Sequence, residues 1–118
     1  MNIEMVVLKK NFLIEDSELD FSIKVRIEDA EKIAEQTDTE IEEIARILAA
    51  IEKSRILSCT YNSVCRRIQK NKMCDTIRTL LNTYRTWELV NIFEDMKYFQ
   101  IREVMESDDV IETLEKYL

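Results

Sequence analysis

The fold class is decided by residues 37–54, which read TDTEIEEIARILAAIEKS. Thr37 and Glu40 are spaced as a capping box, in which the threonine hydroxyl accepts a backbone N–H and the glutamate reaches back. The apolar residues then recur at the i, i+3, i+4, i+7 spacing of one helix face, at Ile41, Ile44, Ala45, Leu48 and Ile51. The stretch predicts a helix that begins after the capping box and ends near Ser54.

Helical spacing continues through most of the chain after this stretch, and a shorter piece precedes it. A short helix is predicted just after Glu28, another over 61–70, and a longer, strongly amphipathic one over 73–89. The stretch 90–105 fits neither period cleanly, and we favour a helix over a short hairpin there. Ser107 is placed to cap a last helix, whose buried edge is predicted to consist of Val110, Ile111, Leu114 and Leu118.

Strand spacing is clearest in residues 19–27, where every odd position is apolar and every even position is polar. Such alternation is typical of a strand with one buried face. The apolar run Ile3–Leu8 is a second candidate strand. We expect the two to pair as a hairpin across the acidic turn at residues 15–18.

The length of 118 residues suits one domain, because independent domains typically contain about 100–150 residues. Apolar residues make up 46% and charged residues 35% of the chain, which is enough for one core and a soluble surface. We therefore predict a single, mainly α domain over 1–118, a small helical domain of four to five helices. Residues 1–27 form the β-hairpin and residues 28–118 the helical part.

Glycine, proline and histidine are all absent from the sequence. Without glycine the chain lacks the phosphate-binding loops in which the backbone approaches phosphate too closely for a Cβ atom. Without histidine it lacks the usual general base near neutral pH and the commonest zinc ligand. We expect a protein that is not an enzyme, with no catalytic, cofactor-binding or metal-binding residues and no small-molecule substrate.

The cysteines and the apolar runs indicate an intracellular setting. Cys59, Cys65 and Cys74 are odd in number and match neither a disulfide framework nor a zinc knuckle, so we expect them to stay reduced. Cys65 shares the apolar stripe of the helix predicted over 61–70, where it should be buried and unliganded. No apolar run approaches the roughly 20 residues that span a bilayer, and Glu4 precedes the first apolar run, the reverse of a secretory signal. We expect a protein of the cytoplasm or nucleus that does not associate with membranes.

The net charge of −7 conceals three blocks of opposite sign. Residues 1–52 contain six basic and fourteen acidic residues, residues 53–85 contain eight and one, and residues 86–118 contain three and nine. The basic block and one asparagine supply the candidate interaction surface, which comprises Lys53, Arg55, Arg66, Arg67, Lys70, Lys72, Arg78, Asn82 and Arg85. A cationic face of this kind suits nucleic acid or an acidic protein, but the acidic blocks can equally lie over it and neutralise it.

The same block admits a helix-turn-helix interpretation. In it, the helix from Ile41 is the support, 61–70 is the first motif helix and 73–89 is the recognition helix. Arginine and asparagine are the side chains that read guanine and adenine edges, and Arg78, Asn82 and Arg85 would share one face of that helix. Tyr84 and Trp87 would share its apolar face, and we expect both in the core rather than stacked on bases.

The pattern Ile77-Arg78-x-x-Leu81-x-x-Tyr84, continuing to Leu89 and Ile92, resembles the central helix of the α-domain in subunits of the GINS replication complex. The resemblance covers about sixteen residues. The closing segment, Leu114 to Leu118, is similar to the one that ends that α-domain. The resemblance implies a structural subunit whose helices pack against sister subunits and which has no activity of its own.

We accordingly expect a helical protein–protein interaction module, a subunit or adaptor of a multiprotein assembly, whose partner is another protein or a further copy of the chain. One alternative is a small helix-turn-helix nucleic-acid-binding protein that uses residues 53–85. A further alternative is an acidic inhibitor that mimics nucleic acid, which agrees with an isoelectric point near 4.7.

Overall fold

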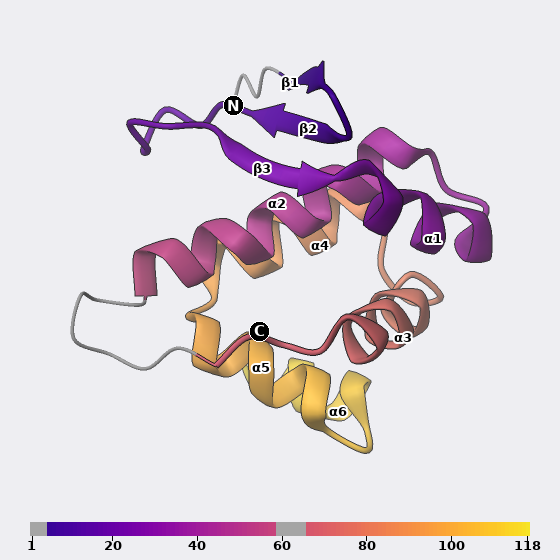
Figure 1. Cartoon of the computed structure of the whole chain (residues 1–118). Coiled ribbons are helices and arrows are strands. Elements are labelled where there is room, and N and C mark those ends of the chain that lie inside the picture. Colours follow the sequence, from indigo (N-terminus) through magenta and orange to yellow (C-terminus); the bar gives the residue numbers. More distant parts are fainter. Residues whose placement is uncertain (1–4, 59–65) are drawn as a thin grey trace.

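A computed structural model describes residues 5–58 and 66–118 (Figure 1). As expected, the fold is mainly helical with β-structure at the N-terminus. The described residues contain three strands and six helices, one strand more than the predicted hairpin and one helix more than the predicted four to five. The elements are β1 (Met5–Leu8), β2 (Asn11–Ile14), β3 (Ile23–Arg26), α1 (Ile27–Thr37), α2 (Ile41–Ser58), α3 (Lys70–Leu80), α4 (Thr86–Asp95), α5 (Tyr98–Glu106) and α6 (Val110–Glu115).

The sheet is antiparallel with the order β1-β2-β3, so the predicted pairing of its first and last strands was wrong. The chain turns at Lys9 and Lys10, and β1 pairs with β2 rather than with β3. Lys9 takes the left-handed conformation, with φ of 57°, although the turn contains no glycine. The apolar run at Phe12 and Ile14 is a strand because it supplies the buried face of the sheet between two neighbours.

The long helix α2 confirms the periodicity of residues 41–51, but the predicted capping box was wrong. Thr37 is the last residue of α1, and its hydroxyl donates to the carbonyl of Ile33 at 2.8 Å. Asp38 then takes the left-handed conformation that ends α1. Helix α2 continues to Ser58, one turn beyond the predicted end.

The helix predicted over 61–70 is not formed where the structure describes it. Residues 66–69 are not helical, and α3 begins only at Lys70, with Gln69 as its N-cap. The expectations for Cys59 and Cys65 lie outside the described residues. Cys74, on α3, is buried and free, and burial raises the pKa of its thiol.

The long helix predicted over 73–89 is interrupted by a turn at residues 81–85. The N–H groups of Thr83 and Tyr84 both donate to the Leu80 carbonyl, at 3.0 and 2.8 Å, which tightens the end of α3. The carboxylate of Glu88 accepts the Arg85 N–H at 3.0 Å and so caps the start of α4. The break lets Leu80 and Leu89 both reach the core, each with no exposed area.

Residues 90–105 are helical, as we favoured, with a break between α4 and α5 at Met96 and Lys97. The cap of α6 is Asp109, whose carboxylate accepts the Glu112 N–H at 3.1 Å, and not Ser107. Leu114 is fully buried, whereas Leu118, predicted on the same buried edge, is exposed.

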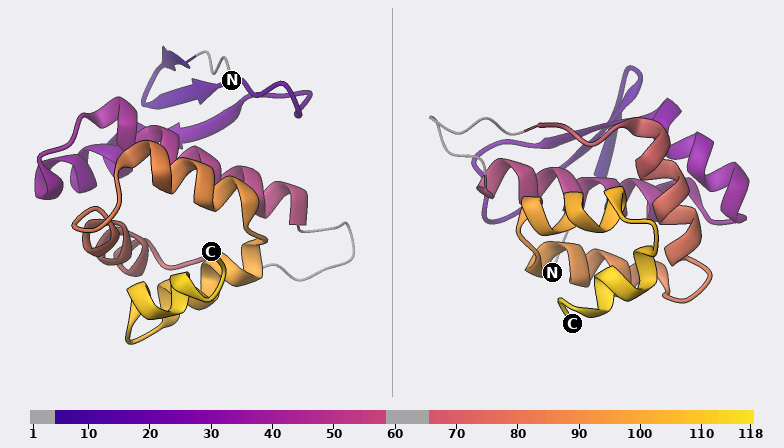
Figure 2. Two further views of the ribbon diagram at one scale, coloured as in Figure 1. Left: turned by 180° about the vertical axis from the view of Figure 1, so that it is seen from behind. Right: turned by 90° about the horizontal axis from the view of Figure 1, so that it is seen from below.

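Helix α2 is the centre of the molecule. The sheet lies on one side of α2, and α5 and α6 lie toward the other, with α4 packed along it (Figure 2). The buried side chains of the sheet and of the helices form one continuous core, which runs from Phe12 and Val25 through Ile44 and Ile47 to Phe93. No helix among the described residues combines the length and the apolar composition needed to cross a membrane.

Candidate protein-interaction groove

Lys53, the first residue of the predicted cationic surface, lies in the interior. Its Nζ is 2.9 Å from Asp16 Oδ2 and 3.3 Å from Glu18 Oε1, and its side chain is 6% exposed. Burial by itself would lower the pKa of the Lys53 ammonium, but the hydrogen bonds and charges of Asp16 and Glu18 together outweigh burial and raise that pKa. Burial would raise the pKa of Asp16, but the Glu18 N–H and Lys53 outweigh it and lower that pKa. Lys53 thus belongs to a buried ion pair.

Most of the remaining cations of the block are paired with carboxylates at the surface. Five of them have an acidic partner within 4.0 Å: Arg55 with Glu52, Arg66 with Glu106, Arg67 with Glu52, Lys70 with Asp29, and Arg78 with Asp75. Four of these pairs have at least one exposed side chain and contribute about 0–1 kcal/mol each, whereas Arg55 and Glu52 are both partly buried. Among the described residues, Lys72 and Arg85 alone of the eight cations have no such partner.

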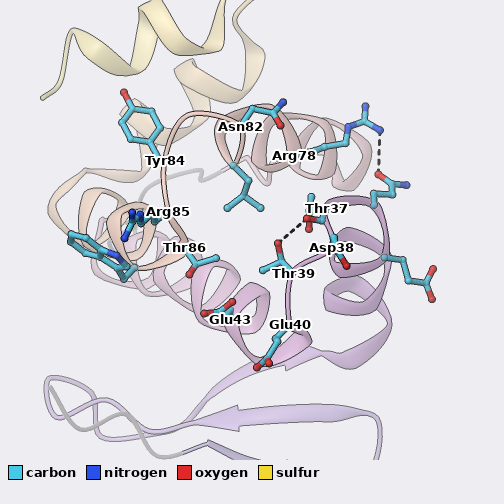
Figure 3. Close-up of a pocket in the computed structure, with 14 residues that line it drawn as sticks. Thr37, Asp38, Thr39, Glu40, Glu43, Arg78, Asn82, Tyr84, Arg85 and Thr86 are labelled. Atoms are coloured by element: carbon cyan, nitrogen blue, oxygen red, sulfur yellow. Dashed lines mark hydrogen bonds between the residues drawn. The ribbon is translucent and has the colours of Figure 1, made fainter.

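Three of the predicted residues do come together, but not on one helix. Arg78 lies in the last turn of α3, Asn82 in the turn that follows, and Arg85 directly before α4. They line a groove of about 860 Å³ (Figure 3). The recognition helix of a helix-turn-helix protein would need all three on one continuous helix face, and the break at residues 81–85 removes that face.

The opposite wall of the groove consists of Thr37, at the end of α1, and the connection to α2, residues 38–40, with Glu43 beyond it (Figure 3). The Thr39 hydroxyl donates to the Thr37 carbonyl at 3.1 Å, which holds this connection in a tight turn. The two walls are linked where the Arg78 guanidinium donates to Gln36 Oε1 at 3.4 Å. The groove is therefore bounded by two short, internally bonded connections.

Four carboxylates line the groove, and none of them forms an ion pair with a residue that the structure describes. They are Glu35, Asp38, Glu40 and Glu43. Arg78 and Arg85 line the same groove, so the groove carries charges of both signs with an acidic excess. Such a surface suits a peptide chain with mixed polar groups and repels a phosphate backbone.

Trp87, in the first turn of α4, is 60% exposed and lines the groove. It also lines a second, smaller hollow of about 270 Å³, together with Val90 and Glu94. The two hollows share Trp87, Thr86 and Glu43, so the indole stands at their junction. The indole of Trp87 is therefore an exposed apolar side chain that lies between two depressions.

The second hollow is lined by Glu94, whose carboxyl group has a raised pKa. Burial raises the pKa of Glu94, and the nearby Asp16 and Glu18 raise it further, while Lys53 acts in the opposite direction. A cationic side chain entering this hollow would reverse the effect of burial by pairing with the carboxylate. Arg46 lines the same hollow, so the hollow carries charges of both signs with an acidic excess.

The prediction that Trp87 lies in the core was wrong, and Tyr84 is only partly buried. On one continuous helix, Trp87 would share a face with Leu80 and Tyr84, but the turn at residues 81–85 changes the direction of the helix axis. The run Asn82-Thr83, with low helix propensity, is the signal in the sequence that could have located this break. The acidic wall, from the connection that begins at Thr37, was not predicted as part of any site.

Comparison with protein-family models, with curated proteins and with solved structures finds no match to this chain. The span that resembles GINS subunits, Ile77 to Ile92, is divided between α3 and α4. The interpretation of the groove therefore rests on its geometry and charges.

Proposed function

We propose that this protein is a non-catalytic interaction module that binds a protein partner in the groove, with Trp87 as the anchor. The exposure of Trp87 carries the proposal. Burying an indole is worth several kcal/mol of apolar transfer, and tryptophan is enriched at the centres of protein interfaces. The core of this molecule buries many smaller apolar side chains completely, yet leaves its single tryptophan in water.

The charges around Trp87 support a partner with a basic residue. Glu43 and Glu94 line the smaller hollow beside one cation, Arg46, so acidic residues are in excess there, and burial raises the pKa of Glu94. A lysine or arginine next to an apolar side chain would fill this hollow and pair with it. Arg78 and Arg85, which line the larger groove, would then donate hydrogen bonds to a carboxylate or carbonyl oxygen of the same segment.

The two alternative functions have less support from the geometry. A nucleic-acid backbone would meet the four carboxylates of the groove, and six cations of the basic block are already paired with acidic residues. An acidic mimic of nucleic acid would present a uniform row of carboxylates, whereas Arg78 and Arg85 interrupt the acidic surface here. Membership of a replication assembly, implied by the GINS resemblance, stays a prediction.

The direct test replaces Trp87 by a photoreactive phenylalanine analogue and captures partners in an extract of the native source. The matched control places the same analogue at Phe99, an aromatic residue on α5 with nearly the same exposure, 57% against 60%. We expect a protein that is captured from position 87 and not from position 99. Capture of the same proteins at both positions would contradict a specific groove.

The energetic test compares Trp87→Ala with Phe99→Ala in binding to the captured partner by calorimetry. Removal of a central tryptophan anchor costs about 2 kcal/mol or more, which corresponds to roughly 30-fold weaker binding. Phe99→Ala should leave the affinity nearly unchanged, and neither variant should unfold the protein, because both side chains are exposed. Equal affinities of the two variants would refute the role of Trp87.

The same protein is tested against duplex and single-stranded DNA at low and physiological salt. Under the proposal, no sub-micromolar binding occurs. Binding that falls steeply with salt, and is lost when Arg66, Arg67, Arg78 and Arg85 are all changed to glutamate, would replace the proposal by the nucleic-acid alternative.

A further inference from the structure

Strand β1 forms the outer edge of the sheet, on the side away from the helices (Figure 1). It pairs with β2 on one side, and no described residue pairs with its other side. Three of its four side chains are more than half exposed: Val6, Val7 and Leu8. An open edge with apolar side chains on both faces is a ready template for another strand.

The hydrogen bonds of the sheet identify which backbone groups of β1 point outward. The Ile27 N–H donates to the Lys10 carbonyl at 2.9 Å, so the backbone N–H and C=O groups of Lys10 point toward β3. The backbone N–H and C=O groups of successive residues point to opposite edges of a strand. Those of Asn11 and Leu13 therefore point toward β1 and form hydrogen bonds with their partners Leu8 and Val6. The N–H and C=O groups of the other two residues, Met5 and Val7, are therefore directed to the open edge.

We propose that β1 pairs antiparallel with β1 of a second copy of this chain, around a two-fold axis that passes through Val6. Side chains opposite each other across an antiparallel pair lie on the same face, so one residue of β1 must face its own copy. A register centred on Val7 would place Met5 opposite Lys9 of the second copy. That register is unfavourable, because Lys9 lies in the left-handed turn beyond the end of the strand. The register centred on Val6 places Met5 opposite Val7 of the second copy, and Val7 opposite its Met5. Each of these two pairs exchanges two N–H···O=C bonds, so the dimer gains four backbone hydrogen bonds.

This register also covers the exposed apolar side chains. Val7 lies on the same sheet face as Phe12 but beyond the reach of the helices, and it remains 59% exposed. Met5 of the second copy would cover it, and Val6 would pack against its own copy on the other face. The result is one continuous six-stranded antiparallel sheet.

A second copy is the occupant because the two ends of the hairpin carry opposite charges. Lys9 and Lys10 form one end, and Glu15 follows β2 at the other, directly after the residue that faces Met5. Antiparallel pairing brings the lysines of each copy to the acidic end of the other. The strand ends that carry Lys9 and Glu15 would then be two strand spacings apart, about 9.6 Å, so their opposite charges attract each other most strongly at low ionic strength.

The first test is sedimentation equilibrium of the full chain over concentrations from micromolar to millimolar. We expect a weak dimer, with a Kd on the order of 0.1 mM for such a short strand pair. Val7→Pro removes an N–H that points to the open edge, so the hairpin should remain while the dimer weakens at least about tenfold. The control Leu57→Lys changes a side chain of similar exposure on α2 and should leave the dimer unchanged.

The second test uses a charge swap, which does not depend on tolerance of proline. The double variant Lys9→Glu/Lys10→Glu and the single variant Glu15→Lys should each self-associate less than the wild type, because like charges then meet at both ends. An equal mixture of the two should restore association, since both junctions again combine opposite charges. A wild-type chain that stays monomeric at millimolar concentration, a dimer unaffected by Val7→Pro, or a mixture that fails to associate would each overturn the proposal.

Discussion

At the scale of single residues, the pair formed by Lys53 and Asp16 shows how burial changes the role of a charge. Lys53 is on α2, and Asp16 is in the connection between β2 and β3, so the ion pair ties the sheet to the central helix. Inside the protein each charge satisfies the other, and neither can be removed without leaving its partner unpaired. The pair also illustrates that a lysine within a basic stretch need not belong to a surface.

Lys53→Met should lower the free energy of unfolding by about 3–5 kcal/mol, because it leaves the Asp16 carboxylate buried without its partner. The double variant Lys53→Met/Asp16→Leu should recover much of the loss. Urea unfolding measures all three proteins, with Lys72→Met as the control, since Lys72 is exposed and its change should cost less than about 0.5 kcal/mol. A loss below 1 kcal/mol in Lys53→Met would mean that water reaches the carboxylate.

The same pair predicts the dependence of stability on pH. The pKa of Asp16 is lowered from its ordinary value of 3.8, so its contribution is complete above that value and is lost as the pH falls through the folded-state pKa. The pKa of Lys53 is raised from 10.5, so its contribution is complete below that value and is lost as the pH rises through the folded-state pKa. The difference in unfolding free energy between the wild type and Lys53→Met/Asp16→Leu should therefore be constant between about pH 4 and pH 10 and change outside that window.

At the scale of elements, the helix boundaries depend on short side chains that bond to free backbone groups. Asp109 accepts the Glu112 N–H, and the Ser107 hydroxyl accepts the Asp109 N–H and contacts the hydroxyl of Thr113 at 2.6 Å. This small network orients α6 against α5. The turn between α3 and α4 likewise shapes the groove, because it leaves Trp87 exposed.

Asp109→Ala should destabilise the protein by about 1 kcal/mol, the usual cost of losing an N-cap. The matched control is Asp108→Ala, because Asp108 has the same charge, is exposed and makes no side-chain hydrogen bond with the described residues. Thermal unfolding followed by circular dichroism distinguishes the two variants. Equal effects of both changes would indicate that the negative charge near the start of α6, and not the hydrogen bond, stabilises it.

At the scale of the whole molecule, the sheet and the helices share a single core. Strand β3 packs on α1 and α2, and α2 packs on α4 and α5, so no described element except β1 stands apart from the helices. The chain should accordingly unfold as one cooperative unit. The two surfaces proposed for binding, the groove at Trp87 and the edge at β1, are built from different elements of this unit.

Amide hydrogen exchange by NMR measures this cooperativity residue by residue. The amides of Val25 in β3 and Ile47 in α2 should report the same free energy of opening, because both are exposed only by global unfolding. The amide of Val7 should exchange faster, since it points to the open edge of the sheet. A clearly lower value for Val25 than for Ile47 would show that the sheet opens by itself.

The residues that line the groove show where prediction from the sequence succeeded and failed. The basic block located one wall, with Arg78, Asn82 and Arg85, because those residues are close together in the chain. The acidic wall, from Thr37 to Glu43, comes from a segment about 40 positions earlier, and no local pattern relates the two. Trp87 was placed in the core, because its exposure depends on a helix break that the apolar period does not record.

The amino-acid pattern was enough to predict the elements whose signals are local: the helical period of α1 and α2, the alternation of β3, and the mainly α composition of the fold. The three-dimensional fold was needed to learn which strand lies beside β1, which lysine is buried and which aromatic side chain remains in water. Local periods express what one element can bury, whereas partners in a sheet, buried ion pairs and exposed anchors depend on contacts between residues far apart in the chain.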